Sequence, residues 1–345
     1  MRPKVKIVDV VRASGVSRAT VDRVLNNRSG VKEATRTQVM QALQSLGYAP
    51  DALSALLKKR PHDIRIFLLD GTNPFFAEIR NGFKHAIEAI ETLGVNASCI
   101  DFDPYTPKTL ERALMAPDDM TSAIIAVGAE TAATAKAIDA LQARGIPVIT
   151  VISDIASSKR TKHIGQDNYA AGETAGRLMA KMVPIGLGSI GLLIGHSDFE
   201  HLNERQTGFT KTLRRMRPDL KLITTEPYGG TDTGCMQLVD DLFTNSSDLK
   251  GVYLSGGGQP HLIEALSRNR TAHQTIIAHE ISQLSRAALE QGTFQALVAH
   301  DIAHVARMAI DAAIESTDKP QETSRNTCQK PCGINIYVPE NLPKT

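Results

Sequence analysis

The stretch GVSRATVDRVLNNR, residues 15–28, places three arginines and a serine on one short segment near the start of the chain. Ser17 is a residue type favoured at helix N-caps, where its hydroxyl accepts a bond from a free backbone N–H group. After it, apolar side chains recur at helical spacing, at Val21, Val24 and Leu25. The stretch therefore predicts a short helix with an apolar side and an arginine-rich side.

The flanking segments predict two more helices around this one. Residues 5–14 hold apolar side chains at helical spacing, and the Ser14-Gly15 step after them suits a tight turn. Residues 33–46 repeat the helical pattern and end at Gly47. Two short helices joined by a glycine-containing turn, with a third helix beside them, make a helix-turn-helix unit.

In such a unit the second helix lies in the major groove of DNA, and its first residues face the base edges. Arg18 and Ala19 hold these positions and Arg23 follows further along, where a guanidinium can bond guanine O6 and N7. Groups placed to bind phosphates are Ser17, Thr20, Thr35 and Arg36. A solvated basic face on a purely structural bundle is the alternative for the same pattern.

The charge of the chain is divided unevenly. Residues 1–60 carry 12 Lys and Arg against 4 Asp and Glu, whereas the other 285 residues carry 27 against 33. A basic segment joined to a mildly acidic body indicates a module for polyanions attached to a domain with another task. Aromatic residues make up only 4% of the chain, which argues against a stacking surface for single-stranded nucleic acid.

The basic segment resembles the DNA-binding head of the lactose-repressor (LacI/GalR) family. The resemblance rests on DVVRASGVSRATVDRVLNN (9–27), on V-x-x-x-TR-x-x-V (31–39) and on LGYAPDALSALL (46–57). It implies a helix-turn-helix head over residues 1–48, followed by a hinge helix and linker over 49–61.

The resemblance bears on two further residues, one in the predicted hinge and one in the head. Leu57 matches a leucine that wedges into the minor groove, although burial against the next domain is an alternative for it. Asp22 stands where the family usually has Ser, and its carboxylate could pair with Arg18 or accept a bond from cytosine N4. The residues predicted to bind DNA are Ser17, Arg18, Ala19, Thr20, Asp22, Arg23, Asn26, Thr35, Arg36 and Leu57.

From residue 62 onward, short β-rich runs alternate with helical patterns. Predicted strands cover 64–70, 95–101, 122–128, 146–153, 189–195, 220–226, 251–255, 274–280, 294–300 and 334–338. Such alternation predicts an α/β architecture with parallel sheets flanked by helices, and ten strands suggest two sheets in two lobes. Small ligands bind at the carboxyl ends of such strands.

This part resembles the type I periplasmic-binding-protein fold, the effector domain of the same family. The resemblance rests on NPFF (73–76), IGQDNYAAGETAGRLM (164–179), ERQTGF (204–209), VYLSGGG (252–258) and INIYVPENLP (334–343). It implies a two-lobed effector-binding and dimerisation domain over 62–345, whose chain crosses between the lobes near 160, 290 and 325. The expected N-lobe is about 62–160 and 290–325, and the expected C-lobe about 161–289 and 326–345.

The effector site is expected between the lobes. Asn73, Phe75 and Phe76 follow the first strand, and an amide beside two rings suits a sugar. The rings would cover its C–H faces and the amide would bond its hydroxyls. Arg205 matches the cleft arginine of the family, and a guanidinium can donate two parallel bonds to vicinal hydroxyls or to an anion.

The resemblance also places polar residues at three strand ends in this site. Asp154 stands where the family has a polar contact, Glu280 where Asp is usual, and His300 where Gln is common. The histidines hint at a ligand with some negative charge, such as a sugar acid or a phosphate. A histidine whose bonds are satisfied within the protein is the alternative.

Other chemistry finds little support. GLGSIG at 186–191 fits G-x-G-x-x-G, but a helix precedes it and a strand follows, the reverse of a dinucleotide site. The cluster His196, Glu200, His201 and Glu204 lacks the spacing of a zinc enzyme. The sequence indicates no cofactor, no metal site and no catalytic constellation. Scattered cysteines and short apolar runs indicate a cytoplasmic protein without a membrane segment.

Together these observations predict a homodimeric transcription regulator, a repressor, that binds a near-palindromic double-stranded DNA operator. A small sugar-like effector between the lobes would control its affinity for DNA. A sugar-binding transport protein without a DNA role is the alternative, and it would not bind duplex DNA. A sugar-converting α/β enzyme is a third class, and it would need a base and a nucleophile converging on the cleft.

Overall fold

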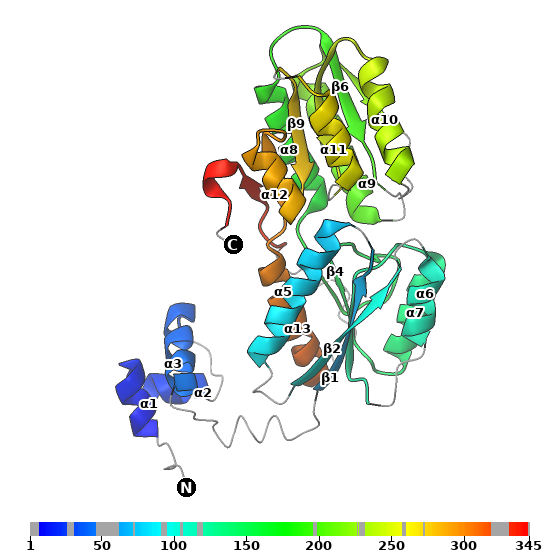
Figure 1. The fold of residues 1–345 in the computed structure, drawn as a ribbon. Coiled ribbons are helices and arrows are strands. Elements are labelled where there is room, and N and C mark those ends of the chain that lie inside the picture. The colour runs from blue at the N-terminus through cyan, green and yellow to red at the C-terminus, as the bar shows by residue number, and fades with distance from the viewer. Residues whose placement is uncertain are drawn as a thin grey trace. The chain divides into compact units, whose positions relative to one another are not determined.

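In the computed structural model, two compact units follow one another along the chain, Met1–Pro61 and His62–Thr345. The structure describes residues 7–25, 31–45, 62–71, 73–90, 95–103, 106–115, 120–195, 199–225, 227, 232–256, 260–271, 273–318 and 331–343. Figure 1 labels most of their helices and several of their strands. No described helix combines the length and the apolarity that crossing a membrane requires.

The described part of the first unit contains three helices, α1 (Ile7–Ser14), α2 (Arg18–Leu25) and α3 (Glu33–Ser45). One apolar core joins them, made by Val10, Val21, Val24 and Val39. Between α1 and α2, Gly15 has φ +63°, a left-handed conformation that glycine adopts without the strain a side chain would add. This arrangement confirms the predicted helix-turn-helix head.

The first lobe of the second unit is built on a parallel sheet with the strand order β2-β1-β3-β4-β5. Its strands are β1 (His62–Leu69), β2 (Val95–Phe102), β3 (Ala123–Ala126), β4 (Val148–Val151) and β5 (Lys162–Ile164). One face is covered by α5 (Pro74–Ile90) and α13 (Ile302–Asp318), and the other by α6 (Pro107–Met115) and α7 (Ala132–Ala143) (Figure 1). Because both faces are covered, every residue of β3 and β4 is buried.

The second lobe has the strand order β11-β10-β9-β8-β6-β7, in which β11 is antiparallel to β10. Its strands are β6 (Gly188–Leu193), β7 (Leu220–Thr224), β8 (Leu249–Leu254), β9 (Thr275–His279), β10 (Ala296–Ala299) and β11 (Asn335–Tyr337). Helices α8 (Asn168–Met182) and α9 (Glu200–Met216) cover one face. The other face is covered by α10 (Asp232–Thr244), α11 (Pro260–Asn269) and α12 (Gln283–Glu290).

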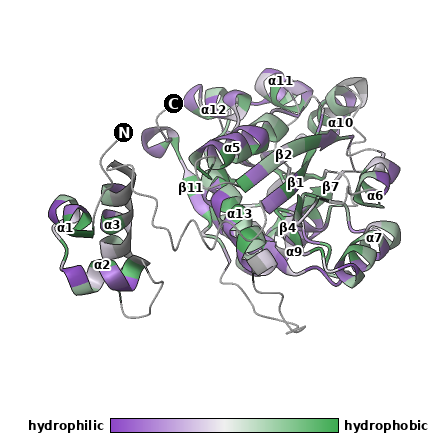
Figure 2. Ribbon diagram, turned by 90° about the horizontal axis from the view of Figure 1, so that it is seen from below, coloured by the Kyte–Doolittle hydropathy of each residue, from purple (hydrophilic) through white to green (hydrophobic). Residues whose placement is uncertain are grey.

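The hydropathy of the second unit follows these layers. In Figure 2 the strands are mostly hydrophobic, while the helices around them turn hydrophilic residues outward. This pattern places a separate apolar core in each lobe. The predicted class, two parallel-sheet lobes flanked by helices behind an all-α head, is confirmed.

The chain passes between the lobes at three places. The first passage follows β5, a three-residue strand in the first sheet that the sequence pattern did not reveal. The second follows Ala299 rather than residue 290, because β10 pairs with β9 and β11 and so keeps 296–299 in the second sheet. The third passage was expected near 325, and that position lies outside the described residues.

Helices α8 and α9 approach each other closely through glycines. A Cβ atom placed on Gly172 would lie 2.1 Å from the backbone oxygen of Arg205, and one placed on Gly208 would lie 2.1 Å from that of Tyr169. A side chain in either space would force the two helix backbones apart. The glycines therefore allow the first turns of α8 to pack closely against the middle of α9 on one face of the second lobe.

Replacing Gly172 with Ala is expected to lower the free energy of unfolding by about 2 kcal/mol, because the added methyl overlaps the α9 backbone. Urea unfolding followed by circular dichroism measures the change. Gly333→Ala is the matched control, since a Cβ atom there meets nothing within 4 Å. A Gly172→Ala variant as stable as this control would contradict the close contact.

Candidate functional site

One face of α2 is exposed and carries the groups predicted to read DNA. Arg18, Ala19 and Arg23 are exposed, while Val21 and Val24 are buried in the core of the head. The helix therefore presents two guanidinium groups and a small residue on the side away from its own core. Such a face can enter a major groove and donate to base edges.

The first turn of α2 is fixed by its own cap. The Ser17 Oγ accepts a bond from the Thr20 backbone N–H at 3.2 Å and lies 2.9 Å from the Thr20 Oγ1. Gln38 of α3 donates from Nε2 to the Ser14 backbone oxygen at 2.9 Å. Ser17 is thus confirmed as the N-cap, and α3 is tied to the turn before α2. Phosphate contacts by Ser17 and Thr20 stay predictions.

For the other predicted DNA-binding residues, the structure gives only burial or position in a helix, or does not describe them. Asp22 and Thr35 are half-buried, and Arg36 lies within α3. Asn26 and Leu57 lie outside the described residues, as does the predicted hinge over 49–61. Their roles stay predictions.

A buried ion pair lies at the carboxyl ends of the second-lobe strands. The fully buried Arg205 donates from Nη2 to the Glu280 Oε1 at 2.5 Å. Its Nε donates to the Asn168 Oδ1 at 3.0 Å, and its Nη1 donates to the Ser255 backbone oxygen at 3.1 Å. Every nitrogen of this guanidinium therefore has a protein partner, so Arg205 first of all organises the protein around it.

Glu280 is fixed from a second side by His300. The His300 backbone N–H donates to the Glu280 Oε2 at 3.1 Å, and the His300 Nδ1 lies 2.9 Å from the Glu280 Oε1. Glu280 directly follows β9 and has φ +66°, a conformation that costs a non-glycine residue about 1–3 kcal/mol. The bonds from Arg205 and His300 hold the carboxylate in this conformation.

Burial and neighbouring charges set the protonation of this network. Burial alone would raise the pKa of Glu280, but His300 and Arg205 outweigh it and hold that pKa well below its usual range. Burial lowers the pKa of His201 and of His279 well below the ordinary histidine value, and the charge of Arg205 adds to both effects. Glu280 is therefore ionised and these two histidines are neutral at neutral pH.

The same network reaches the first lobe. Asn168 donates from Nδ2 to the Ile152 backbone oxygen at 3.4 Å, and Gln166 donates from Nε2 to the Asn168 Oδ1 at 3.3 Å. Ile152 directly follows β4 and has φ +65°, which is rare for a β-branched residue. Since Arg205 and Glu280 belong to the second lobe, these bonds connect the strand ends of both lobes.

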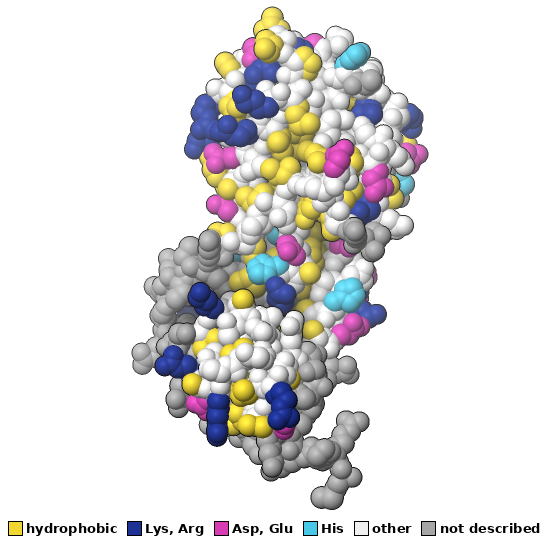
Figure 3. All heavy atoms as spheres, turned by 90° about the vertical axis from the view of Figure 1, so that its left-hand side faces the viewer, with side chains coloured by type: hydrophobic (Ala, Val, Ile, Leu, Met, Phe, Trp, Pro, Cys, Tyr) yellow, Lys and Arg dark blue, Asp and Glu magenta, His cyan; other side chains and the backbone are white. Residues whose placement is uncertain are grey.

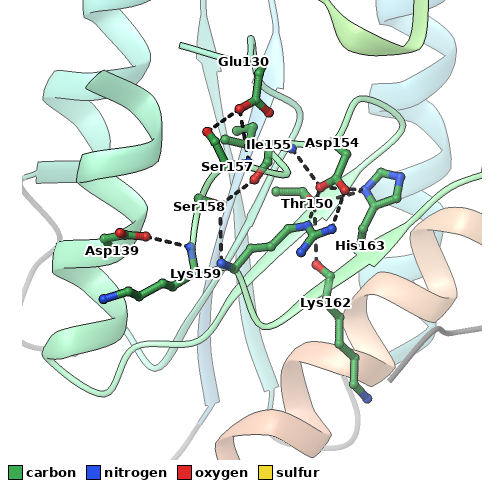
Figure 4. A network of polar contacts seen from close by, with 11 residues as sticks. Glu130, Asp139, Thr150, Asp154, Ile155, Ser157, Ser158, Lys159, Lys162 and His163 are labelled. Atoms are coloured by element: carbon green, nitrogen blue, oxygen red, sulfur yellow. Dashed lines mark hydrogen bonds and ion pairs between the residues drawn. The ribbon is translucent and has the colours of Figure 1, made fainter. Parts of the chain in front are cut away.

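Asp154 lies in a network of its own beyond the end of β4 (Figure 4). Arg160 donates to both of its carboxylate oxygens, Thr150 donates from Oγ1 to its Oδ1 at 2.8 Å, and the His163 Nδ1 lies 3.5 Å away. Burial would raise the pKa of Asp154, but Arg160 and His163 outweigh it and lower that pKa. The charge of Asp154 is therefore compensated within the first lobe.

Asn73, Phe75 and Phe76, which were predicted to line the effector site, make contacts within the first lobe. The Asn73 Oδ1 accepts a bond from the Phe75 backbone N–H at 3.0 Å at the start of α5. Phe75 and Phe76 are only 6% and 8% exposed and belong to the core of the first lobe. Contact of these rings with an effector stays a prediction.

The sequence did not single out several residues of the two networks, namely Asn168, Gln166, Ser255, Arg160 and His163. Asn168 and Gln166 stand in the stretch IGQDNYAAG, whose resemblance to the family was the available signal. In the sequence His201 stands out only as part of a cluster without zinc-enzyme spacing, yet in the fold it lies near enough to Arg205 for its pKa to respond. No three His, Cys, Asp or Glu side chains are grouped to hold a metal among the described residues.

A helix-turn-helix head joined to a two-lobed α/β domain, with a polar network between the lobes, defines the class of ligand-responsive DNA-binding regulators. The sequence pattern of the lacI family of bacterial regulatory proteins matches residues 6–51, and that of the periplasmic binding protein domain matches 64–320. The chain belongs to the lacI family of bacterial regulatory proteins, with a periplasmic binding protein domain behind its head. The resemblance predicted from the sequence is confirmed.

Curated relatives include further regulators. The ribose operon repressor of Bacillus subtilis is 27% identical over 78% of this chain and 79% of its own length. The transcriptional regulator DegA of the same species is 27% identical over 61% of each chain. The repressor PurR of Photobacterium profundum is 30% identical over 60% of each chain. The matched segments of the last two thus span less than two thirds of either relative.

Solved structures share the fold of the second unit. A solute-binding protein of an ABC transporter from Burkholderia graminis, in complex with D-arabinose, has a TM-score of 0.72 and 20% identity over 82% of this chain and 96% of its own. A putative LacI transcriptional regulator from Bacteroides fragilis has a TM-score of 0.71 and 17% identity over 82% of this chain and 98% of its own. At these identities the likeness establishes the fold alone.

Replacing Arg205 with Met is expected to lower the free energy of unfolding by about 3–5 kcal/mol, because Glu280 is left buried without its partner. The double variant Arg205→Met/Glu280→Leu should recover part of that loss, since it buries no charge. Urea unfolding measures both. Arg268→Met, which breaks an exposed pair with Asp240 at 2.8 Å, is the control and should leave the midpoint nearly unchanged. Strictly additive losses in the double variant would contradict the coupling.

Stability is expected to fall as the pH drops below about 6.5, because the unfolded chain protonates histidines that the folded chain keeps neutral. His279→Gln should reduce the slope by up to about 1.4 kcal/mol per pH unit, the contribution of one proton. Urea unfolding between pH 8 and pH 5 measures the slope. His85→Gln, on the exposed side of α5, is the control. Equal slopes for wild type and His279→Gln would show that His279 is not held neutral.

Proposed function

We propose that the chain is a sequence-specific DNA-binding transcriptional repressor whose affinity for its operator is controlled by a small sugar-like molecule bound between the lobes. The observation that carries this proposal is the exposed Arg18–Ala19–Arg23 face on a capped helix, in the same chain as a buried network between two lobes. The first feature suits duplex DNA and the second suits a small ligand.

The operator would be read by two heads. A homodimer places two copies of α2 on one side of the duplex, so its operator is near-palindromic with half-sites about 34 Å apart, one helical turn. The face of α2 specifies the bases, and hydroxyl and basic groups around it bind phosphates. Because the operator is part of the cell's DNA, we expect the protein to act in the cytoplasm.

The effector would act through the bonds that join the lobes. The Asn168–Ile152 contact connects the two lobes directly, and Arg205 holds Asn168 in place. A molecule bound there changes how the lobes meet, and a dimer can transmit that change to the spacing of its heads. The coupling is reciprocal, so a ligand that weakens operator binding is itself bound more weakly by the operator complex.

The test of this function uses the purified full-length chain and fragments of its own genome. Fragments retained at moderate salt are sequenced, and the recovered site is titrated by fluorescence anisotropy with and without small-molecule cell extract. Retention of a near-palindromic site whose affinity changes with extract supports the proposal. A chain that retains no fragment would instead be a sugar-binding protein of the transport type.

Arg18→Ala is expected to weaken binding to the recovered operator by about 1–3 kcal/mol and to relax the preference at one base pair of each half-site, because a bidentate contact is lost. Anisotropy titrations with operator variants at that base pair measure both effects. Arg12→Ala, exposed on α1, is the control and should keep the base preference. An Arg18→Ala variant weakened equally on operator and scrambled DNA would rule out base reading by Arg18.

A further inference from the structure

Of the large apolar side chains that the structure describes, the two most exposed stand on one short loop. This loop joins α8 to β6, and in it Ile185 is 96% exposed and Leu187 is 83% exposed. Met182, the last residue of α8, is a third exposed apolar side chain beside them. Single apolar side chains are common on protein surfaces, whereas a group of them in one place marks an interaction site.

The backbone of this loop is fixed by two basic side chains. Arg217, which directly follows α9, donates from Nη2 to the backbone oxygens of Pro184 at 3.1 Å and Gly186 at 3.3 Å. The Lys250 Nζ donates to the Gly186 oxygen as well, at 2.8 Å. The backbone carbonyls on either side of Ile185 are therefore paired within the protein. The fold itself holds this apolar side chain out in water.

Further basic side chains lie beside the loop. Gly172 of α8 faces Arg205 of α9. One turn later Gly176 faces Phe209, so the two helices run in the same direction and their last turns lie side by side at the loop. Strand β7 begins next to Gly188, the first residue after the loop. The exposed basic residues of these elements are Lys181, Arg214, Arg215 and Lys221.

The second lobe thus has a basic tip, formed by residues 181–187, Arg214, Arg215 and Lys221. Figure 3 shows hydrophobic side chains at the outer end of this lobe, with Lys and Arg side chains gathered beside them. None of the four basic side chains forms an ion pair with a described carboxylate. The nearby Asp219 is bonded to Arg217 at 2.7 Å, and Asp248 accepts a bond from the Ser189 Oγ at 2.8 Å.

An apolar centre beside unpaired cations fits an anionic partner. Basic residues in the last turn also stabilise a helix end, which accounts for the lysine and arginines but not for the exposed isoleucine and leucine. A second copy of the chain is a poor partner for the basic tip, because two such tips would bring like charges together.

The form of the basic tip favours a lipid surface over a folded protein. Side chains as exposed as Ile185 and Leu187 stand out from the surface, so a protein partner would need pockets to receive them. The interface of a bilayer takes up apolar side chains without a preformed pocket, and its anionic head groups attract lysine and arginine. The loop is far too short to cross a bilayer, so it would reach only the depth of the head groups.

We propose that the basic tip binds the surface of membranes that contain anionic lipids. Ile185 and Leu187 enter the head-group region, and the four basic side chains contact lipid phosphates. Such attachment is peripheral and reversible, and it needs no membrane-spanning segment. The inference goes beyond the proposed function, since it involves neither the operator nor the effector.

Flotation with vesicles tests this surface. The full-length protein is mixed with vesicles of phosphatidylcholine alone or with about one-third phosphatidylglycerol, and the fraction that floats with the lipid is measured. The protein is expected to float with the anionic vesicles at about 0.1 M salt and to be released at about 0.5 M, because salt screens the basic side chains. Equal flotation with both kinds of vesicle would contradict a role for these charges.

Because the head is basic too, variants separate its contribution from that of the basic tip. Ile185→Ser/Leu187→Ser keeps every charge of the chain and is expected to lower partition onto anionic vesicles at least tenfold, since the apolar contribution is lost. Met115→Ser/Met120→Ser, at exposed residues of the first lobe, is the matched control and should bind as wild type. If Ile185→Ser/Leu187→Ser also bound as wild type, the attachment would come from elsewhere and the proposal would be overturned.

A photo-crosslinking amino acid in place of Leu187 tests the same surface in living cells. Adducts with phospholipid are expected. Adducts with a protein instead, or no adducts, would overturn the lipid surface, and the former would assign the basic tip to an acidic polypeptide. Operator affinity should be equal for wild type and Ile185→Ser/Leu187→Ser, so failure of this inference leaves the proposed function in place.

Discussion

The buried contact between Arg205 and Glu280 is the interaction on which the two-lobed part of this protein depends. Two charges removed from water are tolerated only when their remaining hydrogen-bonding atoms are also satisfied. Asn168 and Ser255 do this for Arg205, and His300 does it for Glu280. In satisfying the pair, the chain fixes the ends of β8, β9 and β10 relative to α8 and α9. The geometry of the proposed effector site therefore follows from the requirements of one ion pair.

The same requirement connects the two lobes. Asn168 is shared: its Oδ1 accepts from Arg205 in the second lobe, and its Nδ2 donates to Ile152 in the first. Ile152 and Glu280 both have positive φ where a strand ends, and strained backbone of this kind persists at sites that the surrounding contacts hold in one arrangement. A ligand that adds bonds at this junction alters a shared set of contacts. The head, with its own valine core, can keep its DNA-reading face unchanged while its presentation to the operator changes.

Local patterns in the sequence were sufficient for the head and for most of the sheets. The cap at Ser17, the turn at Gly15 and the valine spacing are properties of neighbouring residues, and the structure has them as expected. The sequence pattern does not predict strand β5, because KHI is three residues long and mostly polar. The partners of Arg205 could not be deduced from local sequence, since they lie 37 to 95 residues away and meet only in the fold. The pairing of Asp154 with Arg160 likewise depends on how the loop after β4 turns back.

The central claim is that occupancy of the junction and occupancy of the operator are one coupled equilibrium. Measuring how operator DNA alters binding of the isolated effector, by calorimetry on free and operator-bound protein, tests it most directly. The account predicts that the effector's dissociation constant changes on operator binding by the same factor by which the effector changes operator affinity. Identical effector affinities in the two states would contradict it.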